Sequence, residues 1–592
     1  MISSGKSRCL VLSLLLCSSL FVTTNSQASS TPDEAFKMSN EPGLGYFGYT
    51  SYPYSNVIGH PAALIGMVTS ANKVNSISFC NSLSDVSCSQ ADFFQYASAL
   101  TFCKNDSEAD CIVEVLAKDK NGKSLTVNRV PEFFTDKLNQ YEGDSKIGLP
   151  PGSSPPLIEI PEAPHQAGAV YMPLVTSYGR YDKTTDKMVT SELGELAIYA
   201  VSKTTGKFPV KKISTRPSSY PERNWRASGG DPQERPYTDS AEQCIFNDYT
   251  HCVKPHALPL DINFGITVRN SGTVRGWFHG RITEPEIKQE RSNNGVITLT
   301  VWGKPIQIPG FSTWKKKTEL PQDVISYYKA QTRYENPLGG SGSGAGRADL
   351  QAGPDDGWSL MRSNNVGFDR NKMEEFLLWL PIVGDKASLA PTVWILKSTT
   401  DFSSGLIRDN QCVQDLTALT GIVSTNASQY LAGPPEYDQI NNELTYKVAS
   451  PHLMPNGEEV RGTYDLTMRA DLARCLYGVT GTNFKVSISV ISQNNQLVEA
   501  VTSVIEKNGW FYFSAKGFTF SSPTIKVKFE RETPVETSKP AADSSVSGGT
   551  VNNVATKAVQ SVSKKSITCI KGKATKKITG INPKCPVGYK KK

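Results

Sequence analysis

The chain has little of what most catalytic sites require. Its 592 residues include six histidines, and neither an HExxH motif nor a GxSxG nucleophile elbow occurs. Four histidines stand without a neighbouring pattern that identifies a catalytic triad: His251, His256, His279 and His452. Carboxylate pairs for glycoside hydrolysis cannot be read from a sequence, because their separation is spatial. Two acidic couples are interpreted as solvated loop charges: Glu284/Glu286 and Glu458/Glu459. We therefore predict no catalytic residue, no metal and no cofactor, and favour a non-enzyme.

Long apolar runs are absent after the first thirty residues. Lys6 and Arg8 form a short positive region before the apolar stretch 10–22, which is too short to span a bilayer. Small residues at Ser26-Gln27-Ala28 then predict a secretory signal, residues 1–28, that is cleaved after Ala28. A lipid anchor at Cys17 is the weaker alternative, since Leu14 stands where a small residue is expected.

Acidic residues are absent from the last part of the chain. Residues 557–592 contain eleven lysines and no acid, so the net charge of +7 conceals a body, residues 29–556, of about −6. An acidic body argues against nucleic-acid binding by the folded domains. We expect instead an electrostatic contact made by the tail, residues 566–592, through eight lysines: Lys571, Lys573, Lys576, Lys577, Lys584, Lys590, Lys591 and Lys592.

The tail also contains a cysteine couple. A bridge between Cys569 and Cys585 would close a small hairpin and hold the lysines on a fixed surface. The expected partner is an anionic envelope polymer or a phospholipid surface, with a sorting address read by export machinery as the competing interpretation. No LPxTG-like sequence indicates covalent sorting. Residues 531–565 are small and polar and predict a flexible, disordered linker before the tail.

No CxxC pair is present. After removal of Cys9 and Cys17 with the signal, ten cysteines remain, and in an exported protein their sequence-local couples predict disulfides: Cys80/Cys88, Cys103/Cys111, Cys244/Cys252, Cys412/Cys475 and Cys569/Cys585. The first two couples allow cross-pairing between them. A zinc site of Cys244, His251, Cys252 and His256 is the less favoured alternative.

Residues 29–72 are rich in Gly, Pro, Tyr and Ser, and we expect irregular structure there. The stretch Gly43-Leu44-Gly45-Tyr46-Phe47-Gly48 spells GxGxxG, but it lacks the flanking strand and helix of a dinucleotide site. A tyrosine cluster in this segment predicts packing onto a neighbouring domain, or alternatively a contact surface for a ligand: Tyr46, Tyr49, Tyr52 and Tyr54.

Two modules are expected in the first two thirds of the chain. Residues 73–150 form a small disulfide-stapled unit, with a short helix over 91–102 and a hairpin turn at Asn121-Gly122. Residues 165–385 form a β-rich domain with long loops and a further turn at Asn294-Gly295. Short helices fit 321–333 and 371–380, although 376–380 fits a buried strand equally well.

Residues 390–530 show the clearest module. The run from Phe484 to Ile491 alternates apolar and polar residues, and turn residues such as Asn508-Gly509 separate the strands that follow. This spacing predicts an antiparallel β-sandwich. The expected fold class is mainly β, with several antiparallel sandwich-like modules, disulfides, few short helices, a disordered linker and a small C-terminal hairpin.

Two segments resemble uncharacterised exported proteins of actinobacteria. One comprises GTYDLTMRADLARCLYG at 462–478, GWF at 509–511 and GFTFSSPTI at 517–525; the other is the tail from Cys569. The resemblance covers about 140 residues plus the tail. It implies export and a modular architecture, and no activity or site residue.

These observations favour a secreted, non-enzymatic cell-surface protein that adheres, scaffolds or binds glycans or proteins and is docked to the envelope by its basic tail. A secreted hydrolase acting on glycans or peptides is the first alternative. A component of an envelope lattice is the second.

Overall fold

The computed structural model confirms the mainly β class. The residues that it describes are 46–51, 62–70, 73–135, 140–208, 210–214, 232–238, 244–272, 274, 276–330, 360–364, 370–398, 412, 418–431, 433–438, 443–477, 484–491, 497–498, 500–520, 524–531, 565–571, 574–580 and 590–591. The chain divides into two compact units, residues 1–532 and 533–592. The expected signal, residues 1–28, lies outside the described residues.

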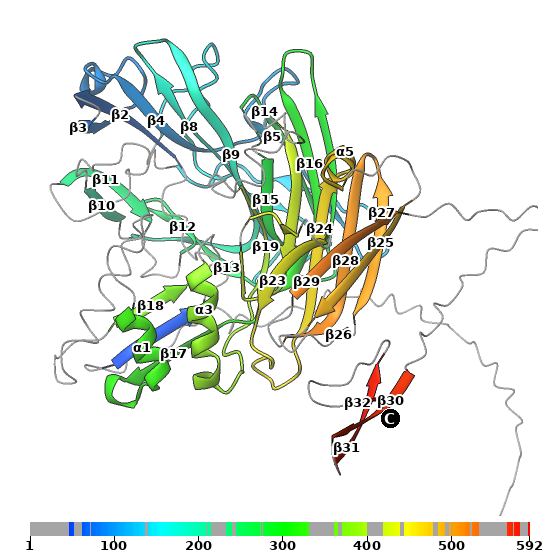
Figure 1. Cartoon of the computed structure of the whole chain (residues 1–592). Coiled ribbons are helices and arrows are strands. Elements are labelled where there is room, and N and C mark those ends of the chain that lie inside the picture. The colour runs from blue at the N-terminus through cyan, green and yellow to red at the C-terminus, as the bar shows by residue number, and fades with distance from the viewer. Residues whose placement is uncertain are drawn as a thin grey trace, which may run out of the picture. The chain divides into compact units, whose positions relative to one another are not determined.

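The N-terminal half of the first unit is built on one run of antiparallel pairings, β3–β2–β4–β8–β9, which continues from β9 to β13 and β19 (Figure 1). Its strands are β2 (Ala63–Ser70), β3 (Lys73–Phe79), β4 (Phe93–Ala99), β8 (Val170–Asp182), β9 (Lys187–Thr205), β13 (His251–His256) and β19 (Thr392–Ser398). Short strands and one 3-10 turn complete it: η2 (Val86–Cys88), β6 (Asn128–Arg129), β7 (Ile158–Glu159) and β12 (Phe246–Asn247). A separate two-stranded ribbon pairs β10 (Val210–Ser214) with β11 (Pro232–Thr238).

A second run, β5–β14–β16–β15, crosses the expected module boundary, because β5 of the 73–150 segment pairs with β14 of the next. Its strands are β5 (Cys111–Lys118), β14 (Asn263–Asn270), β15 (Gly276–Arg291) and β16 (Ile297–Gln307). The first half of β15 pairs with β19 and β20, and the rest, from Ile282, pairs with β16, with a register shift between Thr283 and Glu286. β15 therefore joins sheets at a corner, as bulged strands commonly do.

The sandwich expected over 390–530 has two layers. One layer is β20–β24–β28–β27, and the other is β23–β29–β25, with short strands at its margins. The strands are β20 (Leu419–Thr425), β21 (Gln429–Tyr430), β22 (Glu436–Asp438), β23 (Glu443–Ala449), β24 (Arg461–Arg469), β25 (Phe484–Ile491), β26 (Leu497–Val498), β27 (Val501–Lys507), β28 (Trp510–Thr519) and β29 (Thr524–Arg531). One helix, α5 (Ala470–Tyr477), follows β24 directly.

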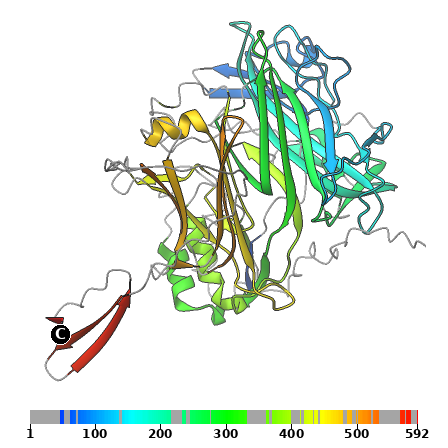
Figure 2. The same cartoon turned by 90° about the vertical axis from the view of Figure 1, so that its right-hand side faces the viewer.

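The β24–β28 layer has an apolar face and a polar face, as period-2 alternation requires. Tyr464 and Phe513 belong to the core that this layer shares with β23 and β29. On the other face, Asp465 and Tyr512 contact the second half of β15. Figure 2 shows the orange strands of this module beside the long green strands that precede them.

A smaller sheet lies apart from these runs. β1 (Tyr46–Ser51) pairs with β17 (Phe311–Lys316) and, in parallel, with β18 (Leu360–Asn364). Helices α1 (Gln322–Ala330) and α3 (Arg370–Trp379), with turns η4 (Lys317–Glu319) and η5 (Pro381–Val383), accompany it. The helical alternative for 371–380 is thus confirmed. Tyr49 is fully buried there, and its ring stacks on that of Trp379 with the ring centroids 5.3 Å apart, so it packs in a core. Tyr52 and Tyr54 lie outside the described residues.

Two expectations about local structure are wrong. Residues 29–72 were expected to be irregular, yet they contain β1 and β2, whose apolar side chains reach buried positions in two sheets. Residues 91–102 were expected to form a helix, yet 93–99 form β4. The sequence of β4, FFQYASA, buries every second residue at first, and pairing with β2 and β8 on both sides overrides its helical spacing.

The expected turns are confirmed. Gly122, Gly295 and Gly509 adopt positive φ values of 80°, 86° and 79°, and Asn508 joins the last of them with a φ of 54°. Two consecutive residues of positive φ form the tight turn that suits a right-twisted hairpin. Asn508-Gly509 accordingly connects β27 directly to β28.

Candidate functional site

The tail forms a small sheet of its own in the second unit. β30 (Lys565–Lys571) pairs with β31 (Ala574–Gly580), and β32 (Lys590–Lys591) adds to the other edge of β30. The predicted hairpin is present, and the third strand is an addition. In register, Lys576 and Lys591 lie opposite Cys569, and Lys577 lies opposite Thr568.

The sheet strands contain five of the eight predicted docking lysines: Lys571, Lys576, Lys577, Lys590 and Lys591. Three others lie outside the described residues, as does the cysteine expected to pair with Cys569: Lys573, Lys584, Lys592 and Cys585. The strand pairing therefore brings lysines from three separate parts of the tail into one small sheet.

Four cysteine couples of the body are bonded as neighbours: Cys80–Cys88, Cys103–Cys111, Cys244–Cys252 and Cys412–Cys475. The bond between Cys244 and Cys252 overturns the zinc alternative, because a thiol must be free and deprotonated to bind a metal. Within the described residues, no group of three or more His, Cys, Asp or Glu side chains is placed to hold a metal ion.

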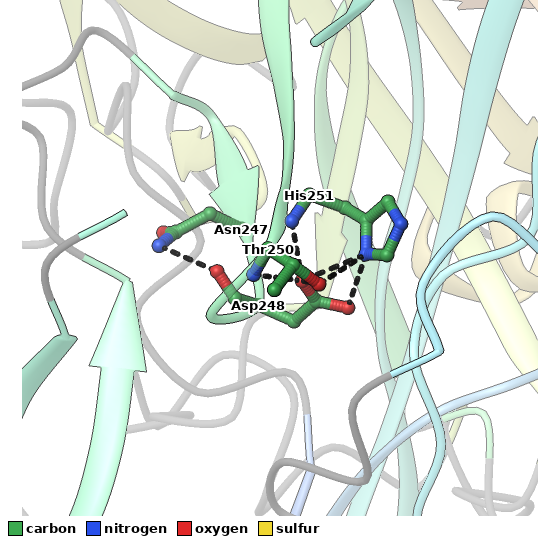
Figure 3. Close-up of polar contacts among 4 residues, drawn as sticks. All are labelled: Asn247, Asp248, Thr250 and His251. Carbon is green, nitrogen blue, oxygen red and sulfur yellow. Dashed lines mark hydrogen bonds and ion pairs between the residues drawn. The ribbon is translucent and has the colours of Figure 1, made fainter. Parts of the chain in front are cut away.

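An aspartate–histidine pair occupies the loop that the Cys244–Cys252 bond closes (Figure 3). Asp248 follows β12 and is fully buried. Its Oδ1 accepts hydrogen bonds from the backbone N–H groups of Thr250 at 2.9 Å and His251 at 2.6 Å. Both carboxylate oxygens also lie 3.1 Å from Nδ1 of His251. This is the side-chain turn typical of aspartate, and it fixes the start of β13.

The carboxylate also orients the imidazole of His251. Nδ1 lies 2.9 Å from Oγ1 of Thr250, and the ring packs edge-on against Phe133 at 4.8 Å. The side chain keeps 17% of its surface exposed, and no hydrogen bond joins Nε2 to another described residue. A carboxylate-held imidazole is one component of a general base, and a nucleophile or bound ligand at Nε2 would have to complete it. Sequence reasoning considered His251 as a metal ligand and missed Asp248, although the Asp-x-Thr spacing signals such a turn.

A second histidine, His279 on β15, lies in a buried polar group with Tyr430. Its Nδ1 is 2.8 Å from the Tyr430 hydroxyl. Burial, with Lys397 and Arg281 nearby, lowers the pKa of His279 to about 3. The imidazole is therefore neutral at physiological pH and is part of the fold.

The lowered pKa of His279 predicts that the stability of the protein decreases in acid. The pKa of His279 lies below its unfolded value of about 6.5, so the unfolded chain binds the extra proton. Its contribution to stability is complete above about pH 6.5 and is lost, at up to about 1.4 kcal/mol per pH unit, as the pH falls towards about 3. Urea denaturation at pH 7 and pH 5 should show a smaller loss for His279→Gln than for the unaltered protein. His452→Gln is the control and should keep the full loss; an equal loss in His279→Gln would contradict the assignment.

Arg281, two residues along β15, is a buried cation. It is 3% exposed, and its guanidinium donates to the backbone carbonyls of Thr425, Ala427 and Ser428. The same group stacks over the ring of Tyr430 at 4.5 Å. These contacts fasten the segment that connects β20 to β21.

The acidic couple Glu284/Glu286 was interpreted as solvated loop charge; both side chains are exposed, but their place in a loop is wrong. Both residues lie in β15, where Glu284 has a φ of 56° at the register shift. Its carboxylate contacts the ammonium groups of Lys304 and Lys516 at 2.7 Å each. Glu286 pairs with Lys507 at 3.1 Å. Burial acts to raise the pKa of Glu284, but the two lysines hold it below its ordinary value.

The other acidic couple lies in a loop, as interpreted. Glu458 is exposed in the turn before β24 and contacts Asn456, while Glu459 pairs with Arg461 at 2.6 Å. His452 lies 3.7 Å from Glu459. The remaining histidine of the sequence analysis, His256, lies 2.8 Å from the hydroxyl of Ser202 through Nε2.

Sequence reasoning also missed Asp465, which is buried between β24 and β15. Thr283 donates to its carboxylate at 3.0 Å, and burial raises the pKa of Asp465. Glu284, with a lowered pKa, lies next to it. Two carboxyl groups whose pKa values are pushed apart are typical of acid–base pairs, but Asp465 is 3% exposed and covered by β15. This pair therefore joins two layers and is closed to a substrate.

Comparison with family models, with curated proteins and with solved structures finds no match for this chain. The resemblance to exported actinobacterial proteins stays a prediction.

Proposed function

We propose that the protein is a secreted, non-enzymatic binding or scaffolding protein that docks on an anionic envelope surface through its basic tail. The observation that carries this proposal is the tail sheet, which is a separate unit and places Lys576 and Lys591 in register with Cys569 and Lys577 in register with Thr568. No acidic residue in 557–592 neutralises these charges.

The body supports the export part of the proposal. Its four disulfides are typical of proteins from an oxidising compartment. In the part of the chain that the structure describes, no helix has the length and hydrophobicity needed to span a bilayer. A disulfide-bonded β-sheet body suits repeated contact with a wall polymer, because the disulfides hold its fold when no partner is bound. Of the two expected surfaces, the polymer is favoured, since β30 and β31 contain four lysines, three threonines and three isoleucines and carry no aromatic anchor for a lipid interface.

The test of tail docking is binding to a soluble poly(glycerol phosphate) as salt is raised. If four lysines contact phosphates, raising sodium chloride from about 50 to about 200 mM should weaken binding about 50-fold, because each contact releases a counterion. Deletion of residues 566–592 should abolish binding, and Lys576→Glu with Lys577→Glu should weaken it strongly.

The matched control is Lys120→Glu with Lys123→Glu, two exposed lysines at a hairpin turn of the body. This variant should bind like the unaltered protein. Salt-independent binding, or equal weakening by the control, would disprove tail docking. Binding to anionic vesicles but not to the polymer would move the assignment to a membrane surface. Turnover of glycans or peptides by the purified full chain would favour the alternative of a hydrolase.

A further inference from the structure

Strand β27 exposes an unusual amount of apolar surface. Val501 and Ile505 are 76% and 58% exposed, and Leu497, just before the strand, is 76% exposed. Val501 and Ile505 stand on the same face of the strand, with Ser503 between them. Isolated apolar residues on a surface need no explanation, but a cluster at one sheet margin points to a contact.

β27 is also an unprotected edge. Within the described residues it pairs with β28 alone, over its whole length and without a register shift, so its other side offers free N–H and C=O groups (Figure 1). Natural edges are usually guarded by proline, bulges or outward charges. The strand VTSVIEK has no proline, and both of its charges are held by its own chain: Glu506 by Arg474 at 2.6 Å and Lys507 by Glu286 at 3.1 Å.

The hairpin fixes which groups face outward. Lys507 and Trp510 flank a two-residue turn and therefore form a hydrogen-bonded pair, and such pairs alternate along an antiparallel ladder. The backbone groups of Val501, Ser503 and Ile505 thus bond to β28. Those of Thr502, Val504 and Glu506 point to the open edge.

We propose that β27 pairs antiparallel with β27 of a second copy of this chain, about a two-fold axis at Ser503. In this register Thr502 of each copy exchanges hydrogen bonds with Val504 of the other. Val501 of each copy then lies opposite Ile505 of the other, at the pairs where side chains approach most closely.

Strand β27 is self-complementary in this antiparallel register. The free backbone groups and the exposed apolar residues are both symmetric about Ser503, and an isologous contact requires such self-complementarity. Pairing with a strand of a different protein would not require this symmetry about Ser503. One seven-residue strand provides less than the roughly 800 Å² per partner of a stable interface. The contact is therefore weak in dilute solution and strengthens with concentration, as on a crowded surface. It does not depend on the tail or on what the tail binds.

Sedimentation velocity of the full chain over a concentration series, at high salt to suppress tail contacts, tests the proposal. A monomer–dimer equilibrium is expected. Val501→Lys should weaken it at least about tenfold, because a desolvated charge replaces an apolar contact. Thr502→Pro should weaken it similarly by removing an outward N–H, and it leaves the β28 ladder intact. Val86→Lys is the matched control, since Val86 is 85% exposed at the start of the 3-10 turn η2, and it should leave the equilibrium unchanged.

The two-fold axis has its own test. Ser503→Cys should give a disulfide-linked dimer under mild oxidation, because the two copies of this residue face each other, whereas Thr185→Cys on an exposed hairpin should not. A chain that stays monomeric into the high-micromolar range overturns the proposal. So does a dimer that Val501→Lys and Val86→Lys affect equally, or a Ser503→Cys variant that cross-links no better than its control.

Discussion

Replacing Cys412 with serine is expected to lower the free energy of unfolding by about 4 kcal/mol. The bond from Cys412 to Cys475 spans 63 residues, and closing a loop of this length removes that much conformational freedom from the unfolded chain in the chain-entropy model. Cys412 also packs against the core of the C-terminal sandwich, so its loss loosens apolar contacts as well. Urea denaturation under non-reducing conditions measures the effect.

Two variants make this result specific. The double change Cys412→Ser with Cys475→Ser should behave like the single one, which excludes mispairing of a freed thiol. Cys103→Ser opens a loop with a separation of only 8 and should lower the free energy by about 2.5 kcal/mol. Equal effects at the two bonds would show that loop length does not govern their contribution.

Replacing Arg281 with methionine is expected to lower the free energy of unfolding by about 3 kcal/mol. The change leaves the buried carbonyls of Thr425, Ala427 and Ser428 without their donor, and each unsatisfied group costs about 1–3 kcal/mol. Methionine also removes the cost of burying the charge of Arg281, and this gain offsets part of the loss. The expected loss is therefore smaller than the summed cost of three unsatisfied carbonyl groups.

Arg281→Lys separates geometry from charge. Lysine keeps the cation but lacks the planar fork that reaches several carbonyls at once, so an intermediate loss is expected. Hydrogen exchange should rise in the segment 425–428 of both variants. Unchanged protection there, or a methionine variant as stable as the unaltered protein, would contradict the fastening role of Arg281.

The sequence was most informative where one signal dominates locally. Asn508-Gly509 adopts positive φ at two consecutive positions, which Asn and Gly tolerate better than other residues and which a tight hairpin turn uses. Neighbouring cysteines such as Cys80 and Cys88 are held close by their short separation, so their pairing follows from distance along the chain.

Other features depend on partners distant in sequence. Residues 93–99 become β4 because β2 and β8 flank them, and no local spacing encodes those neighbours. Glu284 is paired because Lys304 and Lys516 arrive from two other strands. Asp248 was the exception, since its turn lies within four residues and was overlooked beside the histidine and the cysteines.

The strand pairings between segments distant in sequence affect how the chain folds. β5 pairs with β14, and β15 pairs with β20, across more than 130 residues in each case. Folding slows as contacts become more distant in sequence, because each long loop must close before its contacts form. β15 lacks one neighbour until residues 419–425 have been synthesised. A chain that is synthesised from its N-terminus therefore holds an incomplete sheet for most of its synthesis, and the edge of β15 that β20 later covers stays open until then.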